Sequence, residues 1–109
     1  MSKFEKEISG DFHQILSLLD QSIMDSGGAI ERVDESDYDS GGVQVAVRVY
    51  DRYYFRNSSR ASLTVTVVGQ NGRVFISAIA AGGGTGVLLY MDWGAEDHFM
   101  RLVKELFEK

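Results

Sequence analysis

The sequence predicts an α+β domain, a two-layer sandwich in which an antiparallel β-meander sheet carries two helices packed on one face. Three observations lead to this prediction. Residues 43–81 contain alternating runs of apolar and polar side chains, Asn71-Gly72 interrupts these runs as a turn, and apolar residues recur at helical spacing near both ends. The 109 residues are enough for one domain, so we expect a single α+β domain over residues 1–109.

The strands are clearest in the middle of the chain. Residues 43–56, 60–70 and 73–81 alternate and are rich in Val and other residues that favour strands. Asn71-Gly72 favours a two-residue type I′ hairpin, which pairs Gln70 with Arg73. We expect residues 57–59 to form a three-residue connection, which pairs Arg56 with Arg60. Residues 87–91 are long enough for one more short strand.

The helices are expected near the two ends. The first covers residues 11–26, with Asp11 as its N-cap, Gln14 three residues later, and two glycines after it. The second covers residues 94–108, where apolar residues recur at helical spacing. Residues 3–8 are expected as a short edge strand and residues 29–33 as a strand, whereas the acidic residues 34–42 are expected as a polar loop.

These pairings sort the side chains of the sheet into two faces, because successive residues of a strand point to opposite sides. The expected core face, packed under the helices, collects Val43, Val45, Val47, Val49, Tyr53, Leu63, Val65, Val67, Val74, Ile76, Ala78 and Ala80. All five arginines of the middle segment fall on the other face. Asp51 breaks the pattern, since it lies on the core face, and a bulge or a sheet-edge position is the expected explanation.

The second face is the candidate binding surface. It combines arginines, which pair with carboxylates and phosphates, with tyrosines and phenylalanine, which are enriched at interfaces. The candidate site residues are Arg48, Tyr50, Arg52, Tyr54, Arg56, Arg60, Thr66, Phe75 and Ser77.

Three uses of this face stay open. It could be a homodimer interface, a site for a small anionic or aromatic ligand, or a surface whose arginines pair internally with the acidic segment 31–39. We expect a non-catalytic binding or interaction module that forms a homodimer. The alternative is a binding protein for a small anionic or aromatic ligand on the same face, near Arg48, Tyr50, Arg52, Tyr54 and Ser77.

Composition and charge exclude several classes of function. The absence of cysteine excludes disulfides and thiolate metal sites, and the net charge of −5 argues against a nucleic-acid or membrane partner. The sequence has no stretch of 18 apolar residues and no apolar signal segment at its start, so we expect a cytoplasmic protein.

Catalytic, metal and cofactor motifs are also missing. The two histidines, His13 and His98, have no metal-binding spacing, and Gly82–Gly86 lacks the context of a phosphate-binding loop. The acidic segment lacks the closing Glu of a calcium loop. We therefore expect no catalytic residue, no metal and no cofactor.

Three segments carry a resemblance to a known family. Residues 53–63 (YYFRNSSRASL), 82–84 (GGG) and 93–96 (WGAE) resemble a family of uncharacterised bacterial single-domain proteins of about this length, a domain of unknown function. The resemblance covers the whole chain and implies a complete single-domain protein, but it implies no activity, cofactor or site residue. The order of the elements is also similar to helix-grip folds, which bind ligands between sheet and helix, although fold alone does not establish function.

Overall fold

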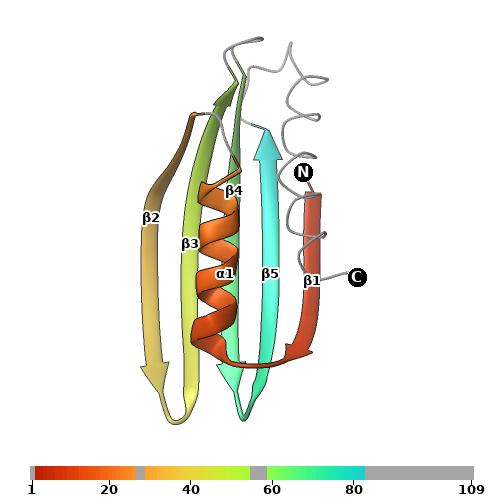
Figure 1. Ribbon diagram of the computed structural model, residues 1–109, viewed down its shortest axis with the longest axis vertical. Coiled ribbons are helices and arrows are strands. Elements are labelled where there is room, and N and C mark those ends of the chain that lie inside the picture. The colour runs from red at the N-terminus through yellow and green to blue at the C-terminus, as the bar shows by residue number, and fades with distance from the viewer. Residues whose placement is uncertain (1, 27–28, 55–58, 83–109) are drawn as a thin grey trace.

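The computed structural model describes residues 2–26, 29–54 and 59–82. These residues form five antiparallel strands in the order β1-β5-β4-β3-β2, with one helix lying across one face of the sheet (Figure 1). The elements along the chain are β1 (Ser2–Ser9), α1 (Phe12–Met24), β2 (Ala29–Ser40), β3 (Val43–Tyr54), β4 (Ser59–Gln70) and β5 (Arg73–Gly82).

The predicted fold class is wrong. The described residues form one 13-residue helix against five strands of 8 to 12 residues, so the fold is mostly β and not a two-helix α+β sandwich. The antiparallel sheet itself was predicted. The expected helix over residues 94–108 and the expected strand over residues 87–91 lie outside the described residues.

Helix α1 begins directly after Asp11, the N-cap residue predicted from the sequence. Asp11 has an extended backbone, and its carboxylate accepts a hydrogen bond of 2.9 Å from the backbone N–H of Gln14. The buried residues of α1, which are Phe12, Ile15, Leu19 and Ile23, recur every three or four positions and face the sheet. The apolar spacing in the sequence therefore predicts both the helix and its buried side.

The acidic segment expected as a loop is instead part of strand β2. Residues 29–40 pair with β3, and the turn Gly41-Gly42 joins the two strands with φ angles of +59° and +85°. Every residue from 31 to 40 is exposed, since β2 is the outer strand of the sheet. A sequence of exposed charges resembles a loop, but charged side chains are also typical of a sheet edge, where they discourage pairing with other chains.

The hairpin from β4 to β5 confirms the prediction based on Asn71-Gly72. Both residues have positive φ, +54° and +75°, as a type I′ turn requires. Gln70 pairs with Arg73, and the same register continues to Thr64 and Ile79. The expected core residues of these two strands, from Leu63 to Ala80, are accordingly buried.

The register between β3 and β4 differs from the prediction. Tyr53, not Arg56, pairs with Arg60, so the two strands are offset by an odd number of residues from the expected pairing. An odd offset turns every side chain of the strand to the other face. Val43, Val45, Val47 and Val49 consequently do not join the buried core, and Ala46, Tyr50 and Arg52 take their place under the helix.

The core lies between α1 and the sheet. Leu19 and Ile23 of the helix are at most 1% exposed, as are Tyr50 and Leu63 of the sheet beneath it. We call the side of the sheet that α1 covers the helix face, and the opposite side the open face.

Candidate functional site

The predicted Arg/Tyr surface is divided between the two faces of the sheet. Arg48, Tyr50 and Arg52 lie on the helix face, because they share the side of β3 that holds the buried Ala46. The other described members lie on the open face, and these are Arg60, Thr66, Phe75 and Ser77. Arg56 and the side chain of Tyr54 lie outside the described residues. The register therefore does not bring the five arginines together on one shared surface.

The two arginines of this surface that lie on the helix face contact other parts of the same chain. Arg48 Nη1 is 2.8 Å from Asp37 Oδ1, and Arg48 Nε is 3.8 Å from a carboxylate oxygen of Glu35. Arg52 is 5% exposed and donates a hydrogen bond of 2.8 Å to the carbonyl oxygen of Ser26, just after α1. Internal pairing with the acidic segment, one of the three uses left open by the sequence, is confirmed for Arg48.

Tyr50 belongs to a polar cluster that ties α1 to the sheet. Its hydroxyl donates to Asp20 Oδ1 at 2.7 Å, and Arg32 of β2 donates to both carboxylate oxygens of Asp20, at 3.0 and 2.6 Å. A two-pronged Arg–carboxylate pair is among the stronger side-chain interactions in proteins. The cluster therefore joins α1, β2 and β3 at one carboxylate.

The cluster shifts the ionisation of its members. Partial burial raises the pKa of Asp20, but the hydrogen bonds from Arg32 and Tyr50, with the charge of Arg32, lower it by more. The pKa of Tyr50 is raised well above its usual value by burial and by its hydrogen bond to Asp20. Asp20 consequently stays ionised, and Tyr50 stays a neutral hydrogen-bond donor, at physiological pH.

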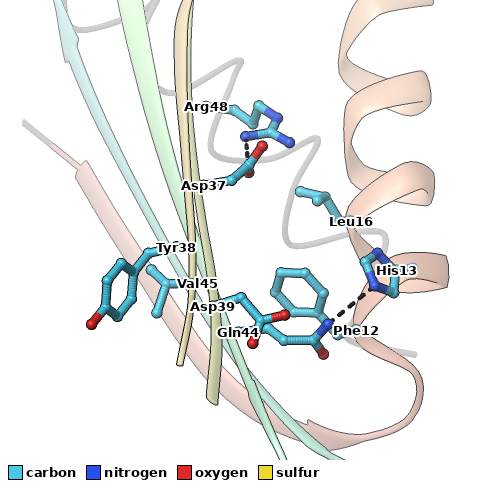
Figure 2. Close-up of a pocket in the computed structure, with 9 residues that line it drawn as sticks. All are labelled: Phe12, His13, Leu16, Asp37, Tyr38, Asp39, Gln44, Val45 and Arg48. Atoms are coloured by element: carbon cyan, nitrogen blue, oxygen red, sulfur yellow. Dashed lines mark hydrogen bonds and ion pairs between the residues drawn. The ribbon is translucent and has the colours of Figure 1, made fainter. Parts of the chain in front are cut away.

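A cavity lies between the first turns of α1 and the β2–β3 hairpin (Figure 2). Its volume is about 300 Å³, at the lower end of the range for small-molecule sites. In Figure 2 the side chains of Tyr38 and Val45 point to the other side of the strands. The remaining lining residues surround the cavity from the helix and the hairpin, and they are Phe12, His13, Leu16, Asp37, Asp39, Gln44 and Arg48.

The open face carries a half-exposed apolar surface. Four valines of β3, from Val43 to Val49, lie beside the threonines of β4 in the middle of this face. Phe75 and Ile79 of β5 are each 38% exposed there, although both are large apolar residues. Exposed apolar side chains that gather on one face of a sheet are typical of a contact region.

The charges on the open face are paired around this apolar surface. Arg73 binds Glu7 at 2.9 Å, and Arg60 binds Asp51 at 2.8 Å. The register of β1, β3, β4 and β5 places three cations and three anions on this face, namely Lys3, Arg60, Arg73, Glu5, Glu7 and Asp51. These four strands therefore present an electrically balanced face, although the whole chain has a net charge of −5.

The comparison with family models matches residues 1–109 to DUF6054, a family of unknown function. The chain belongs to this family. The resemblance seen in the sequence is thereby confirmed as membership of a family of unknown function over the whole chain, and none of the curated proteins matches it.

Neither a metal centre nor a membrane-spanning helix is found among the residues of this DUF6054 chain that the structure describes. Within residues 2–26, 29–54 and 59–82, no group of three or more His, Cys, Asp or Glu side chains is arranged to hold a metal ion. The same residues contain no helix that is long and apolar enough to cross a membrane.

Sequence reasoning missed the roles of Asp20 and Arg32 in this DUF6054 chain. Asp20 is a polar residue in the helix, and Arg32 lies in a segment expected as a strand, so neither stands out by spacing. The sequence nevertheless contained one sign that the expected register of β3 was wrong. Asp51 fell on the expected core face, and the observed register removes this conflict by placing Asp51 on the open face beside Arg60.

Proposed function

We propose that this chain is a non-catalytic interaction module that forms a homodimer by packing the open faces of two sheets together. The observation that supports this proposal best is the half-exposed apolar surface around Phe75 and Ile79, bordered by paired charges. We also propose that the protein is located in the cytoplasm, as expected from its sequence.

The area of the open face matches what a stable dimer needs. Five strands at a spacing of about 4.8 Å, with about ten residues each at ~3.4 Å per residue, give a face of roughly 800 Å². A stable interface of standard size buries about 800 Å² on each partner. Two open faces in contact would therefore form an interface of ordinary size.

Charge favours the face over the β2 edge as the contact between two copies. The outer strand β2 carries five acids and a single base, so two β2 edges would repel each other. The acids are Glu31, Asp34, Glu35, Asp37 and Asp39. The open face of the other four strands is balanced in charge, and the two acids that β2 adds to this face, Glu31 and Asp34, lie at its outer edge. A second copy can therefore approach the centre of the face without net repulsion.

Sedimentation velocity of the wild type and of Phe75→Lys tests the proposal. Phe75 is partly exposed and lies opposite Glu7 and Val68, so a lysine at this position is compatible with the folded sheet. We expect the wild type to sediment with a molecular mass of about twice 12.1 kDa and Phe75→Lys with a mass of 12.1 kDa. The circular dichroism spectra of the two proteins should be the same.

Leu18→Lys is the matched control. Leu18 is an apolar residue of α1, on the other side of the sheet, and is 47% exposed. This variant should remain dimeric. A monomeric wild type, or a dimer that persists in Phe75→Lys, would overturn the proposal, and dissociation by Leu18→Lys alone would move the contact to the helix side.

A further inference from the structure

We propose that the cavity between α1 and the β2–β3 hairpin binds a small amphipathic organic cation, a compact apolar body that ends in a protonated amine. The proposal rests on the shape and charge of this cavity and is independent of self-association through the open face. The sequence suggested a small anionic or aromatic ligand, whereas this cavity favours a cation.

The shape of the cavity sets the size of the ligand. Its volume of about 300 Å³ equals the liquid volume of about ten water molecules, so it fits a molecule of roughly ten non-hydrogen atoms. Phe12 and Leu16 of α1 form an apolar wall, while Asp39 and Gln44 lie across from them on the hairpin (Figure 2). A ligand with one apolar and one polar end matches these two walls.

The charge of the cavity argues against an anion. Arg48 is the cation of the lining, but its guanidinium already binds Asp37 at 2.8 Å, the carbonyl oxygen of Val47 at 3.0 Å, and Glu35 at 3.8 Å. An anionic ligand would have to compete with two carboxylates for this one side chain. The sequence-based choice of Arg48 as an anion-binding residue therefore does not suit its surroundings.

The carboxylate of Asp39 is the group that favours a cation. It points to the helix side of β2, next to Gln44, with which Asp39 is paired in the sheet. Among the described residues, no ion pair or hydrogen bond engages its side chain. With Glu35, Asp37 and Asp39 against Arg48, this side of the hairpin has an excess of two negative charges.

A second polar group lies beside Asp39. The amide nitrogen of Gln44 is 3.1 Å from Nε2 of His13, which links the hairpin to α1. The amide oxygen of Gln44 is then the part of this side chain that can accept a hydrogen bond from a ligand. A protonated amine has three N–H donors, so it can bind Asp39 and Gln44 together.

Three small probes that share a benzyl group test this inference. Phenethylamine is cationic, 2-phenylethanol is neutral and phenylacetate is anionic, and each has about ten non-hydrogen atoms. Titration followed by ¹H–¹⁵N NMR measures the affinity and maps the site. We expect phenethylamine to bind at least tenfold more tightly than 2-phenylethanol, and phenylacetate to bind more weakly than either. The amide signals of His13, Leu16 and Gln44 should move.

Asp39→Asn and Asp34→Asn form a matched pair of variants. Both remove one negative charge from strand β2, but Asp34 faces the open side and does not line the cavity. Asp39→Asn should weaken phenethylamine binding about tenfold, and Asp34→Asn should change it less than twofold. Equal binding of the three probes, tighter binding of phenylacetate, or equal effects of the two variants would overturn the inference.

Repeating the titration on Phe75→Lys separates this inference from the proposed function. Phe75 lies on the open face, across the sheet from the cavity, so the affinity for phenethylamine should stay within twofold. Signal changes centred on Phe75 and Val68 instead of the cavity would contradict the inference and would leave the dimer proposal untouched.

Discussion

The hydroxyl of Tyr50, in strand β3, donates a 2.7 Å hydrogen bond to the carboxylate of Asp20, in helix α1. Tyr50 is 1% exposed, so its hydroxyl is shielded from water and is hydrogen-bonded to a charged side chain instead. Removing it should therefore destabilise the fold. A hydrogen bond to a charged group contributes about 1.5–3 kcal/mol.

The first prediction concerns this bond. Tyr50→Phe should lower the free energy of unfolding by about 1–2 kcal/mol, because Asp20 keeps its two bonds to Arg32. Urea unfolding followed by circular dichroism measures the change. Tyr38→Phe is the control, since Tyr38 is 66% exposed and should be neutral. Equal stability of wild type and Tyr50→Phe would contradict this role.

The second prediction concerns pH. The pKa of Asp20 is lowered in the folded state, so its contribution to stability is present above its unfolded value, about 3.9, and is lost as the pH falls through the folded value. The wild type should therefore lose stability from about pH 4 downward. Asp20→Asn should be less stable at pH 7 but should lose less between pH 5 and pH 2. Urea midpoints across this range measure both slopes, and parallel slopes would refute the prediction.

The third prediction concerns close packing at Gly69. A Cβ added there would lie 2.8 Å from Cβ of Phe12, closer than real atoms approach, so α1 would have to move. Gly69→Ala should cost about 1–3 kcal/mol, as overpacking does. Gln70→Ala, at the exposed neighbouring position, should change stability by less than ~0.5 kcal/mol. Faster amide exchange in α1 of Gly69→Ala would locate the effect, and an unchanged urea midpoint would disprove the steric role.

The fourth prediction concerns Arg48. Arg48→Gln leaves Glu35 and Asp37 without their cation, so like charges on β2 repel. Because Glu35 and Asp37 are mostly exposed, the loss should be about 1 kcal/mol or less at low salt and should shrink in 1 M NaCl. Urea midpoints at both salt concentrations test this. A loss that does not change with salt would indicate packing of the arginine stem instead of its charge.

The sequence predicts those parts of the fold that local chemistry determines. Asp11 and Gln14 mark the start of α1, and Asn71-Gly72 determines the register of β4 and β5, because a type I′ turn permits one pairing. Strand β1 was also expected at the sheet edge, and it is confirmed there.

The face of β3 could not be predicted because both of its sides are plausible core surfaces. Its valines look like a buried row, whereas Tyr50 and Arg52 look exposed until their partners are known. Asp20 comes from helix α1, and the carbonyl of Ser26 comes from the turn just after it. For the same reason the sequence could not reveal the cavity, which depends on where α1 crosses the β2–β3 hairpin.

The pairing of β1 with β5 has a consequence for how the chain folds. Ser2 is opposite Ala80 and Ile8 is opposite Val74, so the first strand described has its partner more than 60 residues later in the chain. Such long-range pairing slows folding, because closing the long intervening loop costs chain entropy before the contacts form. During synthesis β1 therefore stays unpaired until β5 has emerged from the ribosome, so its edge is open to aggregation or to binding by chaperones.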